Sequence, residues 1–422
     1  MLKKKLGGME LKIENIVLAA RKLKPIVSHT PLQLNVNLSQ EYEANIFLKR
    51  EDLQLVRSYK LRGAYHLISS LTSSQISKGV VCASAGNHAQ GVAFSCAKLK
   101  CKGVIFMPTT APQQKVNQVK MFGGEYVEVK LYGDTFDDAK NAALTYCNET
   151  GTTFIHPFDD EKIMEGQATV GVEILDVMEG EIDFLFVPIG GGGLVSGVAS
   201  YFDSQSPSTK IIGVEPQGAA SMHQSILNNK VTTLKEIDPF VDGAAVKEVG
   251  VKNFDISKRL IDDIIVVPEG KICSTIVQLY NKEAIVAEPA GALTIAALDD
   301  YRGKIKGKNV VCVVSGGNND LQRMPEIKER SLLYEGLKHY FIIRFPQRSG
   351  ALLQFVKDVL GPNDDITRFE YAKKSAKESG PALVGIELKY KYDFQTLVEN
   401  MERAGVSYTH LNNDPNLFEY FV

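Results

Sequence analysis

The stretch PIGGGGLVSG, residues 188–197, has the strand–turn–helix order from which an α/β fold is built. An apolar run precedes it and a segment of helical period follows, so the glycines 190–193 lie at the turn. Without side chains, their N–H groups can approach an anion closely at the helix N-terminus, and we predict a phosphate site there. A tight structural turn without a ligand is the alternative.

Similar units surround this stretch from about residue 44 to residue 320. Apolar runs predict strands at NIFLK, GVVCAS, GVIFMP, EYVEVKL, TTFIHPF, FLFVPIG, KIIGVEP, IIVVP and NVVCVVSGG. Helical segments alternate with them, among them NHAQGVAFSCAKLK, QQKVNQVKMFG and TFDDAKNAALTYCNETG. This alternation predicts an α/β fold with a parallel sheet, whose ligands bind beyond the carboxyl ends of the strands. Two further turns rich in Gly, Ser and Asn follow such strands: ASAGNHAQG at 83–91 and VVSGGNND at 313–320.

A second domain is predicted at the C-terminal end. After the charged, helix-compatible connector PEIKERSLLYEGLKH, the runs YFIIRF, DITRFEYAKK, PALVGIELKY and VSYTHL predict strands, and GALLQFVKDVL and DFQTLVENMERAG predict helices. The order strand, helix, strand, strand, helix, strand is that of a ferredoxin-like α+β unit. We expect a core domain at 1–325, a connector at 326–338 and the second domain at 339–422.

Composition narrows the classes of function. The 422 residues include 48 Lys and Arg against 50 Asp and Glu, a net charge of −2, which argues against nucleic acid or an anionic membrane as a partner. No apolar stretch has the length of a signal peptide or a membrane span, and the 6 cysteines form no disulfide framework, so we expect a cytoplasmic protein. The 7 histidines have no metal-ligand spacing, and no metal site is predicted.

Lys60 is the candidate nucleophile. It stands in LVRSYKLRGAYHLI, residues 55–68, between Arg57 and Arg62, and cations close to an amine favour its neutral, nucleophilic form. A solvated surface lysine is the alternative. A reactive lysine together with a phosphate cradle predicts pyridoxal phosphate, which condenses with a lysine and needs an anchor for its phosphate. Walker and GxGxxG spacings are absent, which disfavours a nucleotide.

Two residues in the other turns are candidate contacts of that cofactor. The carboxamide of Asn87 can hydrogen-bond the ring hydroxyl, although an Asn in such a turn is more often a turn former. Ser315 directly follows a strand, and its hydroxyl can pair with the pyridine nitrogen. A helix N-cap is the alternative role for Ser315.

Four ordered motifs resemble the fold-type II (tryptophan-synthase-β-like) pyridoxal-phosphate enzymes, specifically the threonine/serine dehydratases: SYKLRGA around Lys60, SAGNHAQG around Asn87, GGGGL at 190–194 and SGGN from Ser315. HTPL at 29–32, HPFDD at 156–160 and EPAGA at 288–292 agree with this resemblance. It implies a two-lobed catalytic core. The C-terminal stretch FIIRFPQRSGALLQF resembles the ACT-like regulatory domain of the biosynthetic threonine deaminases, in one copy. The chain departs from the family pattern at Tyr59, Ala168 and Ser349.

The resemblance also implies roles for residues. Lys60 is implied as the catalytic residue that binds the cofactor and takes the Cα proton. The further cofactor contacts implied are Asn87, Gly190, Gly191, Gly192, Gly193, Leu194 and Ser315. The substrate carboxylate is implied to bind at Ser84, Ala85, Gly86 and Asn87. His88 is expected to bond locally, and Glu288 to form a wall of the site or to be structural.

The implied activity is that of an L-threonine ammonia-lyase, which yields 2-oxobutanoate and ammonia in the first committed step of isoleucine synthesis. Isoleucine is the implied inhibitor and valine the implied activator of a homotetramer. The alternatives are another enzyme of the fold (a serine dehydratase, a threonine synthase or a cysteine synthase) and a non-catalytic amino-acid sensor. His88 after Asn87 and the C-terminal domain argue against the two synthases, and Lys60 with an intact glycine loop argues against the sensor.

Overall fold

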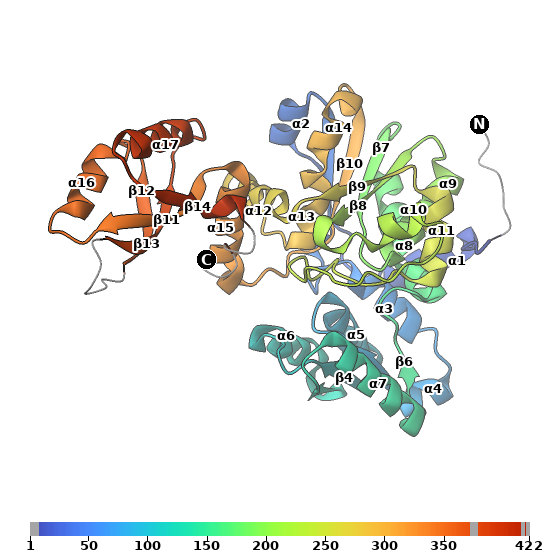
Figure 1. Ribbon diagram of the computed structural model, residues 1–422. Coiled ribbons are helices and arrows are strands. Elements are labelled where there is room, and N and C mark those ends of the chain that lie inside the picture. The colour runs from blue at the N-terminus through green and yellow to red at the C-terminus, as the bar shows by residue number, and fades with distance from the viewer. Residues whose placement is uncertain (1–7, 372–378, 415–417, 419–422) are drawn as a thin grey trace. The chain divides into compact units, whose positions relative to one another are not determined.

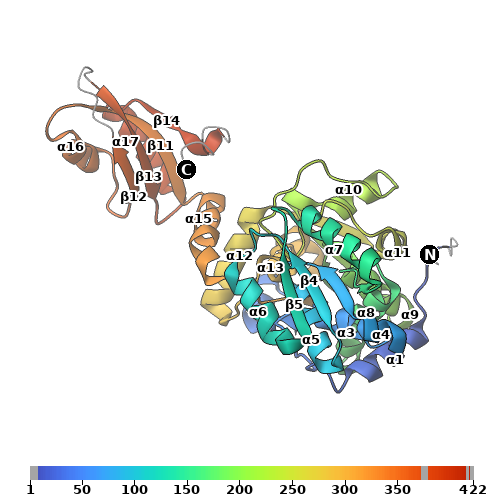
Figure 2. The same cartoon turned by 90° about the horizontal axis from the view of Figure 1, so that it is seen from below.

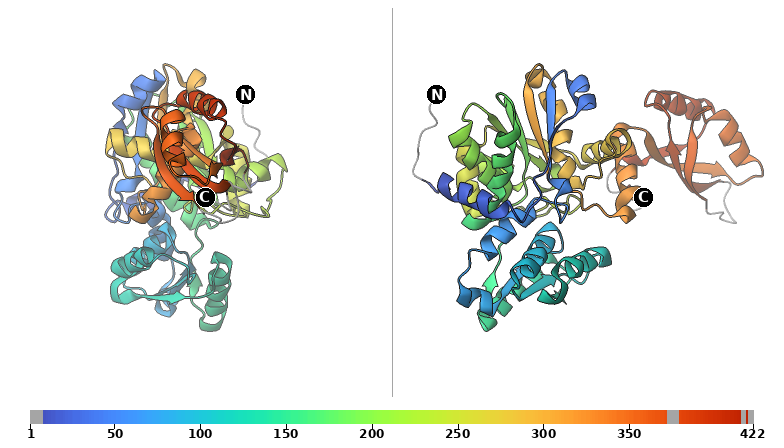
Figure 3. Two further views of the ribbon diagram at one scale, coloured as in Figure 1. Left: turned by 60° about the vertical axis from the view of Figure 1, so that its left-hand side comes forward. Right: turned by 180° about the vertical axis from the view of Figure 1, so that it is seen from behind.

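The computed structural model describes residues 8–371, 379–414 and 418 (Figure 1). The chain divides into two compact units, 1–321 and 322–422. Each of the two sheets in the first unit forms a separate lobe, as both views of Figure 3 show. None of the helices in the described part is long and apolar enough to cross a membrane.

The larger lobe is built on a six-stranded sheet in the order β1–β2–β10–β7–β8–β9. Its strands are β1 (Leu32–Leu34), β2 (Asn45–Arg50), β7 (Phe184–Pro188), β8 (Lys210–Pro216), β9 (Asp263–Val267) and β10 (Asn309–Val314). The predicted strands are confirmed and pair in parallel, but β1 runs antiparallel to β2 at the edge. β1 was not among the predicted strands, because a run of three residues is too short to reveal a strand.

Helices cover both faces of this sheet, which explains why its strands are apolar throughout. They are α1 (Ile13–Leu23), α2 (Val36–Tyr42), α8 (Glu161–Val177), α9 (Gly193–Gln205), α10 (Ser221–Leu227), α11 (Val251–Leu260), α12 (Glu269–Glu283), α13 (Pro289–Ala296) and α14 (Leu298–Ile305), with the 3₁₀ turns η1 (Glu51–Leu53) and η3 (Gln217–Ala219). Val311 and Val313 of β10 pack in one core with α8 and α9. Cys312, between them, contacts the carbonyl of Thr294 in α13 on the opposite face.

The smaller lobe has a four-stranded parallel sheet in the order β5–β4–β3–β6. Its elements are β3 (Val80–Ala83), β4 (Gly103–Met107), β5 (Val127–Leu131), β6 (Thr153–Phe154), α3 (Lys60–Ile68), α4 (Ser73–Lys78), α5 (Asn87–Leu99), α6 (Gln113–Gly123), η2 (Gly124–Tyr126) and α7 (Phe136–Thr150). Cys82 and Ile105 of the sheet pack with α5 and α6, whereas Val81 and Phe106 pack with α7. Figure 2 shows α7 and α5 on opposite sides of β4.

The second unit confirms the predicted ferredoxin-like order. Its elements are η4 (Leu321–Arg323, across the boundary), α15 (Met324–Glu335), β11 (Lys338–Pro346), α16 (Ala351–Asp358), β12 (Asp365–Tyr371), β13 (Ser379–Glu387), α17 (Asp393–Arg403), β14 (Tyr408–His410) and η5 (Leu411–Asn413). The sheet is antiparallel in the order β12–β13–β11–β14, and α16 and α17 bury Phe355, Leu397 and Met401 against it. The end of the predicted strand DITRFEYAKK, residues 372–374, lies outside the described residues.

Candidate active site

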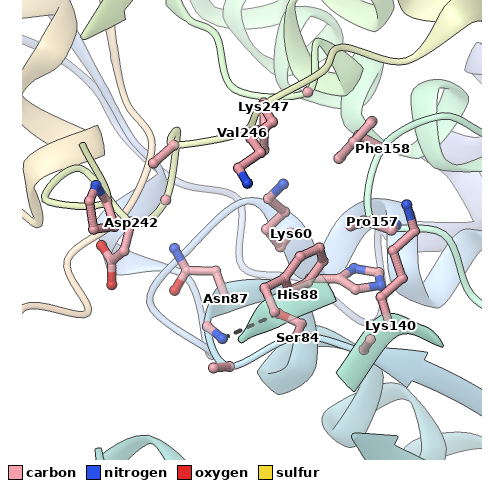
Figure 4. A pocket seen from close by; sticks show the side chains of 18 of the residues that line it. Lys60, Ser84, Asn87, His88, Lys140, Pro157, Phe158, Asp242, Val246 and Lys247 are labelled. Atoms are coloured by element: carbon pink, nitrogen blue, oxygen red, sulfur yellow. Dashed lines mark hydrogen bonds between the residues drawn. The ribbon is translucent and has the colours of Figure 1, made fainter. Parts of the chain in front are cut away.

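A cavity of about 600 Å³ lies between the two lobes of the first unit (Figure 4). Its walls come from the start of α3, the turn after β3, the start of α7, the segment 157–158, the turn after β7 and the segment 233–248, together with Lys115 in α6, Glu288 and Asn318. Six of the predicted site residues line it: Lys60, Ser84, Ala85, Gly86, Asn87 and Gly191. The predicted residues Gly190, Gly192, Gly193, Leu194 and Ser315 are outside its lining. The carboxyl ends of β3 and β7 therefore meet at one cavity, as the α/β pattern predicted.

Lys60 is the first residue of α3, and the backbone before it is tied to the turn after β10. The N–H of Tyr59 donates to the carbonyl of Ser315 (3.2 Å), and Ser58 pairs with Gly316 in an isolated bridge. The N–H of Gly317 donates to the carbonyl of Arg57 (2.9 Å). Two segments that are far apart in the sequence thus set the position of Lys60.

Arg62 does not lie beside Lys60 as an unpaired cation, as the motif suggested. The Arg62 side chain is fully buried and paired with the carboxylates of Glu51 and Glu173, so its charge is neutralised locally. The cations that share the cavity with Lys60 are instead Lys115, Lys140 and Lys247. In Figure 4, Lys60 and Lys247 approach the cavity from opposite walls. Sequence reasoning missed these three lysines, because nothing local marks them.

The turn Ser84–Asn87 presents backbone to the cavity. The Ser84 hydroxyl accepts a hydrogen bond from the N–H of Gly86 (3.2 Å), and α5 begins at Asn87. A Cβ atom at Gly86 would meet nothing within 4 Å, so its backbone faces open space. Because the first N–H groups of a helix have no partner within it, this turn can bind a carboxylate.

The Asn87 side chain is held by two partners from the larger lobe. Its Nδ2 donates to Oε1 of Glu288 (2.7 Å), and its Oδ1 accepts from Nδ2 of Asn318 (2.7 Å). Asn318 also donates to the carbonyl of Val56 (2.9 Å) and to Oε1 of Gln90 (3.1 Å). Asn318 and Glu288 both line the cavity, and no role was predicted for Asn318 from the sequence.

Glu288 combines the two roles that the sequence left open. It lines the cavity, and it directly precedes α13, where its N–H donates to the carbonyl of Gly316 (3.1 Å). Burial, together with the charge of Asp242, raises the pKa of Glu288 to about 7, while the hydrogen bond from Asn87 opposes the shift. The carboxyl group therefore changes its charge near neutral pH.

His88 bonds locally, as expected. Its Nε2 lies 3.0 Å from the carbonyl oxygen of Ile155. Burial, and then the charge of Lys60, lowers the pKa of His88 to about 3. The imidazole is therefore neutral at physiological pH and donates this hydrogen bond.

The glycine loop requires glycine for packing as well as for backbone conformation. A Cβ atom at Gly191 would lie 2.3 Å from the ring of Phe158, and Gly192 has a left-handed φ of 96°. Gly192 precedes α9, so the N–H groups of Gly193 and Leu194 are in the first helical turn and have no partner within the helix. These are the features of an anion cradle at a helix N-terminus.

Ser315 is buried at the end of β10 and is not a helix N-cap, because the next helical turn begins at Leu321. Its hydroxyl donates to the carbonyl of Ala290 (3.2 Å). Ser315 is joined to Lys60 through the backbone of Tyr59, although it lies outside the cavity lining.

The residues present fit pyridoxal phosphate. A lysine at the cavity can bind the aldehyde, and the glycine cradle with α9 can bind the phosphate. The buried Oδ1 of Asn318 has no hydrogen-bond partner among the protein groups described, so a polar ligand group can bind there. We find no clustering of three or more His, Cys, Asp or Glu suited to a metal ion in the described part of the chain.

Comparisons with known proteins identify the family to which this chain is similar. Residues 23–316 match the family of pyridoxal-phosphate dependent enzymes, and residues 329–421 match the C-terminal regulatory domain of threonine dehydratase. The chain is 59% identical over 413 residues to a biosynthetic L-threonine dehydratase of Halalkalibacterium halodurans, covering 98% of this chain and 100% of the relative. It is 57% identical to that of Bacillus subtilis, with 98% of each chain covered.

Solved structures are similar to about three quarters of this chain. A threonine deaminase isoform from Solanum lycopersicum superposes with a TM-score of 0.72 at 38% identity, covering 78% of this chain and 99% of that one. Maize serine racemase superposes with a TM-score of 0.71 at 31% identity, covering 77% and 99%.

Proposed function

Because the chain belongs to the biosynthetic L-threonine dehydratases, pyridoxal-phosphate dependent enzymes with a C-terminal regulatory domain, we propose that it converts L-threonine to 2-oxobutanoate and ammonia. The observation that carries this proposal is that Lys60 and the turn Ser84–Asn87 line one cavity together with Gly191 of the glycine loop. We assign catalysis to residues 1–325, a connector to 326–338 and regulation to 339–422. The high identity over nearly the full length favours a dehydratase over the synthases and the sensor considered from the sequence.

Each cofactor contact has a role in the proposal. Bound pyridoxal phosphate supplies an electron sink for the charge that develops at Cα of the substrate. Lys60 binds the cofactor, and its freed neutral amine takes the Cα proton. Asn87 would contact the ring hydroxyl and the loop Gly190–Leu194 would bind the phosphate. Ser315 would pair with the pyridine nitrogen by turning its hydroxyl away from the carbonyl of Ala290. A neutral hydroxyl at that nitrogen does not force it to stay protonated, which favours elimination over racemisation.

The substrate carboxylate binds at the turn Ser84–Asn87 in this proposal. The open backbone of Gly86 and the free N–H groups at the start of α5 support the assignment. The cavity lysines Lys140 and Lys247 add positive charge that attracts the carboxylate group of the substrate. Because the threonine methyl group contributes only about 1–3 kcal/mol of discrimination, we expect some turnover of serine.

The proposal also assigns effectors, an oligomeric state and a place in metabolism to the chain. Isoleucine binds the second unit and inhibits, valine opposes it, and the chain works as a cytoplasmic homotetramer in the first committed step of isoleucine synthesis. The match of residues 329–421 to a regulatory domain and the ferredoxin-like unit support an amino-acid effector. The free cysteines are compatible with a reducing compartment.

The test is release of 2-oxobutanoate from threonine by the purified full chain, with and without isoleucine. We expect turnover that isoleucine suppresses, and loss of turnover in Lys60→Ala. Lys230→Ala, at an exposed lysine outside the cavity lining, is the matched control and should keep full activity. Turnover that survives Lys60→Ala contradicts the role of Lys60.

Effector binding is tested separately by linkage. Isoleucine should weaken the binding of a non-reacting threonine analogue by the same factor by which the analogue weakens isoleucine binding. An analogue affinity that isoleucine leaves unchanged, or turnover that is insensitive to isoleucine, contradicts the regulatory part of the proposal and leaves the catalytic part intact.

A further inference from the structure

A buried ion-pair network lies behind the helix that carries Lys60. Its charged members are Lys49 in β2, Glu51 in η1, Arg62 in α3 and Glu173 in α8. The side chains of Lys49, Glu51 and Arg62 are 0% exposed, and that of Glu173 is 12% exposed. The network lies outside the cavity lining, so it does not contact a ligand there.

Arg62 uses all five of its guanidinium N–H groups. Nε and Nη2 donate to the two oxygens of Glu51 (both 2.8 Å), and Nη1 and Nη2 donate to those of Glu173 (2.7 and 2.8 Å). The fifth hydrogen bond joins Nη1 to the hydroxyl of Thr169 (3.2 Å). Such a fork has one orientation, because each planar pair of donors matches a planar carboxylate.

Lys49 completes the network and balances its charge. Its amine donates to Oε2 of Glu173 (2.6 Å) and to the carbonyl of Thr30 (2.7 Å), and the Thr30 hydroxyl donates to Glu51. Two cations therefore face two carboxylates. Burial acts to raise the pKa of Glu173, but the charges of Arg62 and Lys49 outweigh it and lower this pKa below its ordinary value.

The network acts on the first turn of α3, where Lys60 lies. Arg62 is two residues after Lys60, and its N–H donates to the carbonyl of Tyr59 (3.0 Å). The next residue, Gly63, packs so closely on α8 that an added Cβ would lie 2.8 Å from the carbonyl oxygen of Ile163. A shift or rotation of this turn would break the Arg62 hydrogen bonds to α8 and η1 together.

We propose that Arg62 is a positioning residue that fixes the first turn of α3 and thereby the direction of the Lys60 amine in the cavity. The inference rests on the proposed function, in which Lys60 binds the cofactor and moves the Cα proton. A buried ion pair is weak evidence for stability, because apolar residues often replace one at no cost. The Arg62 network uses every guanidinium donor close to the reactive lysine. We therefore explain it by the single orientation that it imposes on the turn carrying Lys60.

The test compares Arg62→Lys with two controls in the full-length, cofactor-saturated protein. Lysine keeps the charge but has three donors in place of a five-donor fork, so the turn is no longer fixed. We expect kcat to fall by about 10-fold to about 100-fold with KM nearly unchanged, since a displacement of about 1 Å costs rate in this range. We also expect the absorption band of the lysine-bound cofactor to form more slowly when the apoprotein is mixed with pyridoxal phosphate.

The controls separate positioning from a general loss of stability. Arg50→Lys makes the same change at a neighbouring bidentate pair, Arg50 with Asp52. Its kcat and its rate of band formation should stay within about twofold of those of the parent. Ile68→Ala removes a fully buried side chain at the other end of α3 and should lower the melting temperature without lowering kcat.

Each result decides the inference. If Arg62→Lys keeps kcat and the rate of band formation within about twofold, or if Ile68→Ala lowers both as much, the inference is overturned. If Arg62→Lys does not fold, Glu173→Gln, which withdraws one acceptor from the fork, should show the same fall in kcat at unchanged KM. Lys60→Ala separates failure of this inference from failure of the proposed function. If Lys60→Ala still forms the absorption band of the lysine-bound cofactor and still turns over threonine, the proposed function is overturned.

Discussion

Nδ2 of Asn318 donates a 2.7 Å hydrogen bond to Oδ1 of Asn87. Because this bond occupies the carboxamide oxygen, the Asn87 amide has one orientation, in which Nδ2 donates to Glu288 (2.7 Å). Asn87, the residue proposed to contact the cofactor ring, is thus oriented by Asn318, which lies close to it in space but near the end of the catalytic unit in sequence.

Asn318→Ala should weaken binding of pyridoxal phosphate. The change removes the hydrogen-bond partner that orients the Asn87 carboxamide, a loss of about 0.5–1.5 kcal/mol, so we expect an affinity up to about tenfold lower. A titration of the apoprotein followed by absorbance measures it. Asn228→Ala, at an exposed asparagine that bonds Thr232, is the control, and equal affinities of the two variants would contradict the prediction.

Glu288→Gln should change how stability depends on pH. Burial raises the native pKa of Glu288 to about 7 from an ordinary value of 4.5, so between these values the native state holds a proton that the unfolded state releases. Glu288 therefore makes the protein less stable as pH rises from about 4.5 to about 7, with no further change above. Glutamine keeps the acceptor for Asn87 and does not titrate. The melting temperature of the variant relative to the parent should rise across this window, and parallel curves would show that Glu288 does not titrate there.

Asp242 and Lys115, which form an ion pair with each other at the cavity, should shift the Glu288 pKa in opposite directions. After burial, the Asp242 charge raises this pKa, whereas the Lys115 charge lowers it. Asp242→Asn should therefore move the titration of Glu288 to lower pH, and Lys115→Met to higher pH. Infrared difference spectra of the protonated carboxyl group, with Glu288→Gln as the blank, measure both shifts. Two shifts of the same sign would mean that the ion pair acts through structure and not through charge.

Gly192→Ala should cost more stability than Gly180→Ala. Both glycines have a left-handed φ, 96° and 91°, so both alanines carry a backbone penalty of about 1–2 kcal/mol. An added Cβ at Gly192 would also lie 2.8 Å from Cβ of Asn253, whereas at Gly180 it would meet nothing within 4 Å. We expect an extra cost of about 1–3 kcal/mol at Gly192 in urea unfolding. Equal costs would show that the loop relaxes around the methyl group.

Local patterns in the sequence determined much of the secondary structure and the order of its elements. Apolar runs and turn residues are sufficient to predict strands such as β7 and β10, and the order of elements in the second unit, because strand and helix periods are properties of neighbouring residues. The order of the motifs likewise indicated a lysine, a glycine cradle and an asparagine turn that meet at one cavity. No such local pattern predicted the short edge strand β1.

Tertiary structure alone decided where side chains point and which distant groups they meet. Arg62, two residues after Lys60 in the motif, turns away from it and pairs with two carboxylates, whereas Lys247 from a distant loop shares the cavity with Lys60. The raised pKa of Glu288 likewise arises from burial and from a charge on another segment. These outcomes depend on packing between segments that are far apart in the sequence, and electrostatic interactions depend on distance and burial, which no local pattern encodes.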